Sequence, residues 1–598
     1  MTKYIVLSEF TPPDHGGIQA TLGPIIRMLG QDCTVVAPRT DADHAVRRSL
    51  FSGTGWPRWW WLVGYLRRAR REGAEVAIFG HVSSAVCAGW IASRFFGLRY
   101  IVLAHGNDVL TEQRHAIKRY FLPFLLRKAS WVGVNSAFVR DLVHASGVTL
   151  YRIVATHPFV DADMLSEDRG APRSGRRLIT VARLVARKNV EASIRAVGVL
   201  RKTFPDIHLD IVGDGPERHR LEQVAQELEV QSVVTFHGSV TEQQKWELLR
   251  SSDIFVLVPI VRDGGVDVEG LGLVYLEAAA VGLPIIASAT GGVSSAVQHE
   301  LTGILLHHQD PQAVVDAVAI VLNNPEVAHQ YGMAGQALVQ KEFTDTVRLG
   351  RLGELIGHKK EQQQLPSVSI IIPAYQSADT IAATLDAVQR QTWPSREVIV
   401  VDDGSTDGLE SVIAPYRTEV TYIRQDNAGA PVARNTGFDR SRGELVLFLD
   451  ADTILDPSAI EEMVRVLRLH SDIDFVYSDF RFGWKHFRLH EYSESALKNM
   501  NYIHTTSLMR REVFPRFDPT LKKFQDWDLW LTIAERGGSG MWIPDTLFSV
   551  QARRRGLGMS QWLPSFLYRL PFIGQGKGNA TIAAYRRGER VIRDKHHL

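Results

Sequence analysis

The chain has 598 residues, which corresponds to three or four folding units at roughly 100–200 residues each. Hydrophobic residues make up 45% and charged residues 22% of it. These values are ordinary for a globular protein and exclude a disordered, collagen-like or coiled-coil chain. The 68 Lys and Arg against 66 Asp and Glu leave a formal charge of +2, so no overall positive field favours nucleic acid as a partner.

The composition also argues against a secreted or membrane-spanning protein. Cys33 and Cys87 are the two cysteines, too few for a disulfide framework, and we expect both to be buried thiols. The apolar run at the N-terminus is too short for a signal peptide. The best candidate for a membrane span, residues 270–292, contains Glu277 and is broken by Gly and Pro. We therefore expect a cytoplasmic protein.

Short apolar runs alternate with amphipathic stretches through about the first 340 residues, a pattern typical of strands alternating with helices. Strands that are apolar throughout indicate parallel sheets covered on both faces. A polar stretch near residues 166–177 separates two such series, which predicts two doubly wound lobes, 1–165 and 166–355. The predicted strands are 3–7, 34–37, 75–79, 100–103 and 131–134 in the first lobe, and 178–182, 208–212, 233–236, 254–258 and 284–287 in the second.

A polar linker, residues 356–366, precedes a separate α/β pattern. We assign residues 367–560 to this third folding unit and residues 561–598 to a basic, aromatic C-terminal tail. The predicted strands of the third unit are 368–372, 397–401, 420–423 and 445–449.

Three features of the first two lobes point to a ligand that carries phosphate. A glycine pair ending at Gly17 lies between the first strand and the first helix, where backbone N–H groups can approach an anion. Arg183 and Lys188 follow the first strand of the second lobe, at the edge where doubly wound sheets bind ligands. Glu269 and Glu277 flank a glycine-rich turn, and carboxylates there can accept hydrogen bonds from sugar or ribose hydroxyls.

Each feature alone has an ordinary explanation, a turn or a solvated surface charge, and the features gain weight only together and in this order. Together they resemble the retaining family-4 glycosyltransferases of GT-B architecture, and most of all the phosphatidylinositol-mannosyltransferase branch. The matching motifs are Gly16-Gly17, His105-Gly106-Asn107-Asp108, Arg183 with Lys188, Gly213-Asp214-Gly215-Pro216, Glu269 with Glu277, and Gly291-Gly292-Val293.

This resemblance implies a nucleotide-sugar donor, a GDP- or UDP-sugar, with the branch favouring the GDP-mannose type. It implies cations at the donor diphosphate, a carboxylate at the nucleotide ribose, and a carboxylate and a histidine at the transferred sugar. These residues would be, respectively, Arg183 and Lys188, Glu277, and Glu269 with His105, while Gly17 would line the transfer site. The family needs no metal, since the cations offset the charge of the leaving diphosphate. One departure is Val293-Ser294-Ser295, where many members have Ile-Pro-Glu.

Carboxylates also end two strands of the third unit. Strand 397–401 runs into Asp402-Asp403, and strand 445–449 runs into Asp450-Ala451-Asp452. The carboxyl ends of such strands converge on one crevice, and two Asp separated by one residue can present oxygens to Mg²⁺ or Mn²⁺. Most isolated Asp-x-Asp sequences are solvated turns. This one directly follows an apolar strand, where a charge pair needs a partner.

With Pro373-Ala374-Tyr375 and the stretch 427–437, these motifs resemble the inverting family-2 glycosyltransferases of GT-A fold. The resemblance implies that Pro373, Tyr375 and Asp403 contact the base and ribose of the donor. Asp450 would bind the nucleotide and the metal, and Asp452 would bind the metal.

An inverting transfer needs a carboxylate that takes the proton of the acceptor hydroxyl. The family's base falls on Asp526, and Asp528 is the reserve, which we interpret as a helix-start carboxylate. Gln525 replaces the usual Glu and removes a neighbouring charge. Arg555 stands where members often have a His ligand; arginine cannot bind a metal, but it can bind a diphosphate.

These motifs predict a bifunctional glycosyltransferase that adds two sugars to a growing, lipid-linked surface glycan. The alternative is one active transferase whose partner domain binds glycan or nucleotide; the complete set of charged motif residues favours two active sites. Aromatic and basic residues at 56–71 and 561–598 suit an anionic membrane surface, although a lobe helix and a domain-packing tail would explain them equally well.

Overall fold

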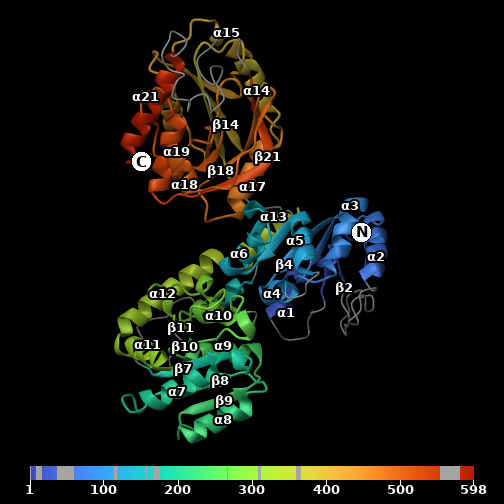
Figure 1. Cartoon of the computed structure of the whole chain (residues 1–598), viewed down its shortest axis with the longest axis vertical. Coiled ribbons are helices and arrows are strands. Elements are labelled where there is room, and N and C mark those ends of the chain that lie inside the picture. The colour runs from blue at the N-terminus through green and yellow to red at the C-terminus, as the bar shows by residue number, and fades with distance from the viewer. Residues whose placement is uncertain are drawn as a thin grey trace. The chain divides into compact units, whose positions relative to one another are not determined.

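The computed structural model describes residues 2–8, 17–36, 59–113, 118–156, 158–165, 175–265, 267–307, 311–357, 365–551 and 580–598. The chain forms two compact units, Met1–Lys359 and Lys360–Leu598 (Figure 1). Most of the predicted linker and the first part of the predicted tail lie outside the described residues. The finer boundaries at 165, 355, 366 and 560 stay predictions.

The first unit begins with a six-stranded parallel sheet in the order β2-β1-β3-β4-β5-β6. Helical crossovers join parallel strands and cover the sheet, which explains why its strands are apolar throughout. The strands are β1 (Tyr4–Leu7), β2 (Cys33–Val36), β3 (Val76–Phe79), β4 (Arg99–Ala104), β5 (Trp131–Val134) and β6 (Ile153–Ala155). The helices are α1 (Gly17–Leu29), α2 (Trp59–Arg71), α3 (Val86–Phe96), α4 (Asn107–Gln113), α5 (Lys118–Lys128) and α6 (Ala137–Ala145).

A second six-stranded parallel sheet follows in the order β12-β11-β10-β7-β8-β9. Its strands are β7 (Arg177–Val181), β8 (His208–Val212), β9 (Val234–Gly238), β10 (Ile254–Leu257), β11 (Ile285–Ser288) and β12 (Gly303–Leu306). Its helices are α7 (Val190–Leu200), α8 (Arg218–Glu227), α9 (Glu242–Ser251), α10 (Leu273–Ala280), α11 (Pro311–Asn323), α12 (Pro325–Glu342) and α13 (Asp345–Ile356). Helix α13 returns to the first lobe and packs against α1 and β6.

The second unit contains a nine-stranded mixed sheet whose main path is β15-β14-β13-β16-β20-β18-β21-β17. Its strands are β13 (Val368–Ala374), β14 (Arg396–Asp402), β15 (Val420–Arg424), β16 (Leu445–Phe448), β17 (Thr453–Leu455), β18 (Phe475–Phe482), β19 (Lys485–Phe487), β20 (Leu508–Arg510) and β21 (Gly540–Val550). Its helices are α14 (Ile381–Gln389), α15 (Leu409–Ile413), α16 (Ala430–Arg440), α17 (Ala459–Leu469), α18 (Glu494–Asn499), α19 (Gln525–Glu535) and α21 (Ala580–Lys595).

The directions of these strands bring several loop regions to one edge of the mixed sheet. Strands β13, β14 and β16 are parallel neighbours. Strand β20 is antiparallel to both β16 and β18, so β18 points the same way as β16. The carboxyl ends of these four strands therefore share an edge, where the Asp-rich motifs lie.

The predicted α/β class, with two doubly wound lobes followed by a third α/β domain, is confirmed. Residues 270–292 are divided between α10 and β11, and within the described ranges no helix is long and apolar enough to cross a membrane. Cys33 and Cys87 are free thiols. Burial is confirmed for Cys87 but is wrong for Cys33, which is partly exposed because β2 is an edge strand.

Candidate active sites

In the first unit, Glu269 lies between two cations. Its Oε2 accepts hydrogen bonds from Arg187 Nη1 at 2.6 Å and from Lys188 Nζ at 2.5 Å. Burial by itself would raise the pKa of Glu269, but Lys188 and Arg187 more than offset this effect, so the net shift is downward. The Arg187 Nε also lies 2.9 Å from Asp267 Oδ1. The predicted pair Lys188 and Glu269 therefore meets in a buried, ionised cluster.

Arg187 was not singled out from the sequence, although it directly precedes Lys188. The 3₁₀ turn Ala186–Lys188 and the left-handed backbone of Asn189 (φ 50°) bring both cations to the same side after β7. Arg183, predicted to act with Lys188, is instead exposed and forms no ion pair with the described residues.

Glu277 is buried in α10 and has one oxygen in use. Its Oε1 accepts a hydrogen bond from Lys245 Nζ of α9 at 2.8 Å, while its Oε2 is buried and finds no hydrogen-bond partner among the described residues. Burial raises the pKa of Glu277 although Lys245 acts in the opposite direction. The second oxygen is thus an acceptor available to a ligand hydroxyl.

The loop that carries Glu269 packs against the histidine motif of the first lobe. A Cβ atom on Gly270 would lie 2.2 Å from the carbonyl oxygen of His105, and one on Gly292 would lie 1.8 Å from that of Gly270. Ser136 Oγ donates a hydrogen bond to the Gly270 carbonyl at 2.7 Å. Only glycine permits these approaches, and they bring the loop that follows Glu269 against the backbone of His105, a residue of the other lobe.

The ring of His105 is oriented by the backbone. Its Nε2 lies 2.9 Å from the carbonyl oxygen of Gly80, which can only accept, so Nε2 carries the proton. Asp108 Oδ1 accepts from the backbone N–H of His105 at 2.9 Å. The sequence analysis missed His81, a buried residue whose pKa burial lowers to about 4, with Asp108 and His105 among the groups that act on it.

Gly17 and Ser295 lie at the start of α1 and in the turn after β11. Gly17 begins α1, as predicted, and Gly16 lies outside the described residues. Ser295 Oγ accepts a hydrogen bond from the backbone N–H of Ala137 at 2.9 Å. Where many family members have Glu, this chain therefore has a short contact between the two lobes.

In the second unit, the Asp403 carboxylate accepts hydrogen bonds from groups of the same unit. Its carboxylate accepts from Gln425 Nε2 at 2.7 Å and from the backbone N–H groups of Ala428 and Gly429 at 2.9 and 2.8 Å. This carboxylate therefore holds the loop before α16. Tyr375 is exposed after β13, and Pro373 is partly buried within that strand.

Arg434 of α16 connects the Asp-x-Asp motif to the helix that carries Asp526. Its Nη2 donates to Asp450 Oδ1 and its Nη1 donates to Gln525 Oε1, both at 2.8 Å. Its Nε is buried without a hydrogen-bond partner among the described residues. Gln525, which stands where family members often have Glu, therefore binds Arg434 through its amide oxygen. The sequence analysis did not single out Arg434.

His504 is a third residue that the sequence analysis missed. The backbone N–H of Thr506 donates to its Nδ1 at 3.0 Å, so the neutral ring carries its proton on Nε2. Burial lowers the pKa of His504, and the nearby Asp450 and Asp526 act in the opposite direction. Asp450 and Asp526, far apart in sequence, thus lie close to one histidine.

Asp526 and Asp528 both lie in the first turn of α19, but their surroundings differ. Asp526 is partly exposed, and its Oδ1 accepts from the backbone N–H of Trp527 at 2.9 Å. Asp528 is 3% exposed and lies 2.8 Å from both Lys595 Nζ and His596 Nε2. Asp528 therefore lies at the start of the helix, as interpreted from the sequence, and in addition it is buried and paired with residues near the C-terminus.

Asp450 and Asp452 follow β16 as predicted, both partly exposed. No group of three or more His, Cys, Asp or Glu is placed to hold a metal ion in the described part of the chain. Arg555 lies outside that part.

Three family models match the chain. Residues 22–164 match "Glycosyltransferase Family 4", residues 162–338 match "Glycosyl transferases group 1", and residues 369–518 match "Glycosyl transferase family 2". The chain is a glycosyltransferase. The predicted fusion of a family-4 with a family-2 glycosyltransferase is confirmed.

Relatives of each half of this glycosyltransferase are known. A GDP-mannose-dependent alpha-(1-6)-phosphatidylinositol monomannoside mannosyltransferase of Mycolicibacterium smegmatis is 29% identical over 385 residues, 60% of this chain and 99% of the relative. A putative teichuronic acid biosynthesis glycosyltransferase, TuaG of Bacillus subtilis, is 28% identical over 223 residues, 34% of this chain and 88% of the relative. The crystal structure of Anabaena HepE in complex with UDP is similar in fold, with a TM-score of 0.50 and 17% identity over 60% of this chain and all of HepE.

The Lys245–Glu277 pair generates a prediction about stability. Lys245→Met leaves a buried carboxylate without its counter-charge, which typically costs about 3–5 kcal/mol of unfolding free energy. Because burial raises the pKa of Glu277, the folded state favours its protonated form, so the loss should be full at pH 8 and smaller at pH 5. Urea unfolding at both pH values measures this. Lys245→Arg, the control, should remain near wild type, and an equal loss at both pH values would contradict the assignment.

Proposed function

We propose that this glycosyltransferase adds two sugars from nucleotide-sugar donors to a growing, lipid-linked surface glycan, one at each unit. The main support is that each unit keeps a charged cluster at the carboxyl edge of its donor-side sheet. In the first it is built on Glu269, and in the second on Arg434. The phosphatidylinositol-linked and teichuronic-acid names of the relatives support a lipid-linked or surface glycan as acceptor.

In the first unit, the donor is of GDP-mannose type, a choice supported by the mannosyltransferase relative. Its diphosphate binds Lys188 and Arg187, with Arg183 closing from the exposed side. The cations stabilise the charge that develops on the leaving diphosphate. As they turn to the phosphates, Glu269 is released to accept hydrogen bonds from the donor sugar. Glu277 Oε2 accepts from the ribose, and His105 and Gly17 line the transfer site. Transfer retains the anomeric configuration.

In the second unit, transfer inverts the configuration in one step. The acceptor oxygen attacks the anomeric carbon, Asp526 takes its proton, and the nucleoside diphosphate leaves. Pro373, Tyr375 and the loop held by Asp403 receive the nucleotide. The hard carboxylate oxygens of Asp450 and Asp452 suit Mg²⁺ or Mn²⁺, and these two residues would hold the ion. When bound, such an ion offsets the charge of the leaving diphosphate.

The second candidate function is a single active transferase, the family-4 unit, with the family-2 unit as a binding module for glycan or nucleotide. Two observations favour it. Arg434 already occupies one oxygen of Asp450, and Arg555 stands where family members often have a His ligand.

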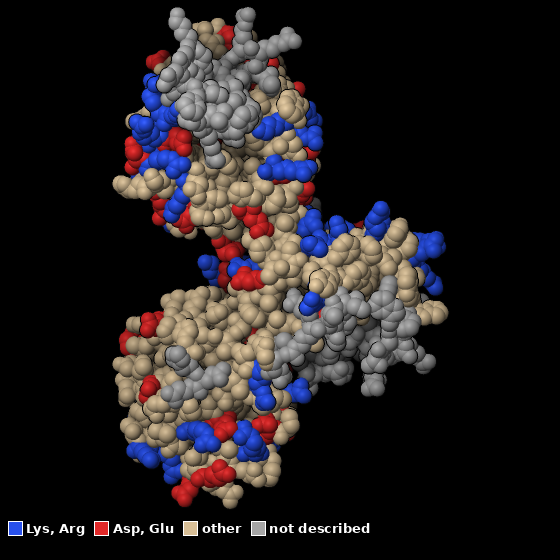
Figure 2. Space-filling model, viewed as in Figure 1, with Lys and Arg blue, Asp and Glu red and all other residues tan. Residues whose placement is uncertain are grey.

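We also propose that the enzyme lies at the inner face of an anionic membrane. In α2, Trp60 and Trp61 are 57% and 76% exposed, and the last turn of the helix is basic. Figure 2 shows Lys and Arg gathered over the lobe that carries α2 and α3. Aromatic and basic side chains on one helix suit the interface of an anionic bilayer. Residues 56–58 and 561–579 of the two predicted membrane segments lie outside the described residues.

The two units should differ in stereochemistry and metal dependence. The first transfer should retain configuration and proceed in EDTA, because cationic side chains serve its diphosphate. The second should invert and stop in EDTA. NMR of both products, with and without chelator, tests this; a first transfer that fails in EDTA would contradict the assignment.

Lys188→Ala and Glu269→Ala should each lower the first transfer by about 100-fold or more, the usual effect of removing one group that stabilises developing charge. The second transfer should not change. Initial rates with separate acceptors measure both reactions. Lys202→Ala, which removes an exposed lysine of the same lobe, is the control. A first transfer within about tenfold of wild type, about 1.4 kcal/mol, would show that Lys188 does not bind the diphosphate.

Asp526→Asn should lower the second transfer by at least about 100-fold, the lower end of general-base contributions. Donor affinity, measured by calorimetry, should persist because it depends on Asp403 and Asp450. Asp545→Asn, which neutralises an exposed carboxylate of β21, is the control. If Asp526→Asn kept its rate, the family-2 unit would use another base, whereas a wild-type protein with no second transfer would favour the binding module.

A further inference from the structure

Helix α21 packs against α19, the helix whose first turn carries Asp526 (Figure 1). Ile592 of α21 is fully buried in the same core cluster as Trp527 and Trp530 of α19. The Arg593 guanidinium lies 5.6 Å from the centre of the Trp527 ring, and its Nη2 donates to the carbonyl oxygen of Asn499 at 3.1 Å. The C-terminal helix is therefore part of the core beneath the base candidate.

The turn that enters α19 is strained, and α21 packs against it. Phe524, two residues before Asp526, has φ +60°, a left-handed conformation that is a genuine outlier for a bulky side chain. Such strain costs about 1–3 kcal/mol and persists only where neighbouring groups enforce it. The Phe524 ring lies 4.9 Å from that of Tyr585. A Cβ atom on Gly588 would lie 3.1 Å from the Phe524 ring, so this glycine lets α21 approach the turn.

Lys595, the last residue of α21, and His596, which follows it, contact the next part of the same turn through polar side chains. Asp528 is contacted by Lys595 Nζ and His596 Nε2, and the other ring nitrogen of His596 lies 2.7 Å from Glu535 Oε1. Both ring nitrogens of His596 are therefore within hydrogen-bond distance of a carboxylate oxygen. The His596 ring thus lies between two carboxylates of α19.

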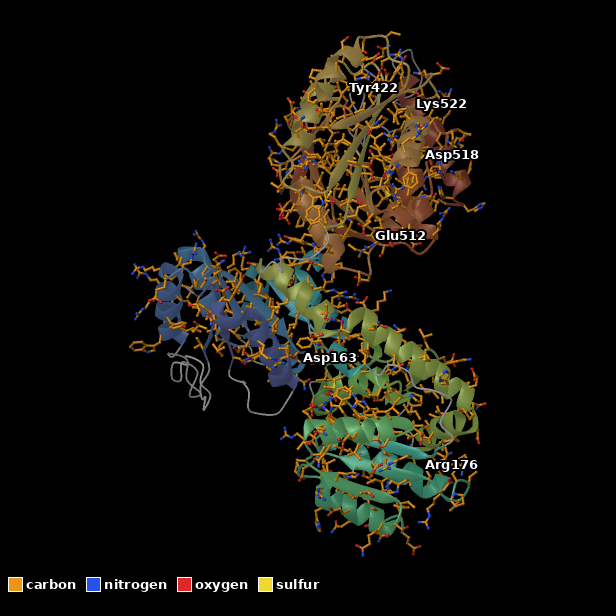
Figure 3. The ribbon with its side chains drawn as sticks, turned by 180° about the vertical axis from the view of Figure 1, so that it is seen from behind. Asp163, Arg176, Tyr422, Glu512, Asp518 and Lys522 are labelled. Atoms are coloured by element: carbon orange, nitrogen blue, oxygen red, sulfur yellow. The ribbon has the colours of Figure 1, made fainter. Side chains whose placement is uncertain are left out.

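A second ion pair ties the same segment to the loop before α19. Lys595 Nζ also donates to Asp518 Oδ2 at 2.7 Å, and this hydrogen bond is the main reason that the pKa of Asp518 falls to about 2. Figure 3 labels Asp518 beside the C-terminal helices of the unit. The contacts of residues 585–596 thus reach positions 518, 524, 527 and 528, on both sides of Asp526.

We propose that α21 and His596 are positioning elements for the base of the second transfer. The inference rests on the proposed role of Asp526. The Asp526 carboxylate accepts its hydrogen bond from the backbone of its own turn, at Trp527 N, so its direction follows the backbone of residues 524–528. A misplacement of about 1 Å at a reacting group can cost about 100-fold in rate. Residues 585–596 hold this turn in place and are not themselves among the proposed donor or metal residues.

The test is His596→Ala in the full chain, measured beside wild type. The second transfer should lose at least tenfold in kcat. Donor affinity by calorimetry and the first transfer should both stay within about twofold. His596→Gln should recover part of the rate, because its amide can still donate to Asp528. Asp594→Asn, which neutralises an exposed carboxylate of α21, is the matched control and should behave as wild type.

Gly588→Ala provides a test that leaves the ion pairs intact. Its added methyl group presses on the Phe524 ring, so it should also lower kcat while donor affinity persists. Thermal unfolding shows whether His596→Ala folds. If it does not, Gly588→Ala and His596→Gln are measured in its place. Folded variants with wild-type kcat would overturn the inference, as would a loss of rate that only matches a loss of folded protein. If Asp526→Asn is inactive beside such variants, the proposed base survives; if Asp526→Asn is active, both proposals fail.

Discussion

A charge that ends a buried strand must be paired before any substrate arrives, and this requirement organises both units. Leaving an ionised side chain unpaired in a low-dielectric site costs several kcal/mol. Before a ligand binds, its phosphates and sugar hydroxyls cannot stabilise these charges. In each unit a carboxylate at the sheet edge, Glu269 or Asp450, is paired with a cation of the same unit.

The two units solve this problem differently. In the first, one carboxylate oxygen of Glu269 accepts hydrogen bonds from both Arg187 and Lys188. The cations proposed to bind the diphosphate are thus paired with the carboxylate proposed to bind the sugar. In the second, Arg434 spans Asp450 and Gln525, so the Asp-x-Asp motif is joined to the helix that carries Asp526. The first arrangement can open when a diphosphate draws the cations away. The second arrangement links the segment after β16 to the start of α19.

The sequence predicted the elements whose pattern of apolar residues is set by neighbours along the chain. Apolar runs bounded by turns predicted most parallel strands, since a strand buried on both faces has no polar positions, and the motif residues at their carboxyl ends follow from that topology. Strands β17, β19 and β20 were missed because three residues carry almost no periodic signal. Strands β18 and β21, which pair in parallel with each other and antiparallel with β20 and β17, mix polar with apolar residues. Strand β6 has only three residues, and β12 was also missed.

Contacts between distant segments account for what the sequence could not predict at the sites. Arg187 and Arg434 are ordinary basic residues until the fold places them at Glu269 and Asp450. Asp528 reads as a helix-start carboxylate because only the folded chain brings His596, 68 residues away, against it. The motifs therefore predict which residues can do the chemistry, whereas the partners that hold them in place depend on tertiary contacts.

The replacement of Glu by Gln at position 525 follows from the same rule of pairing. Arg434 carries one positive charge, and Asp450 supplies one negative charge at 2.8 Å. A glutamate at 525 would add a second negative charge beside Asp526, whereas the glutamine amide binds Arg434 and adds none. On the other side, Asp528 pairs with Lys595 and also contacts the His596 ring. Asp526 therefore lies near the uncharged Gln525 and the paired Asp528, which supports its proposed role as the carboxylate that takes the acceptor proton.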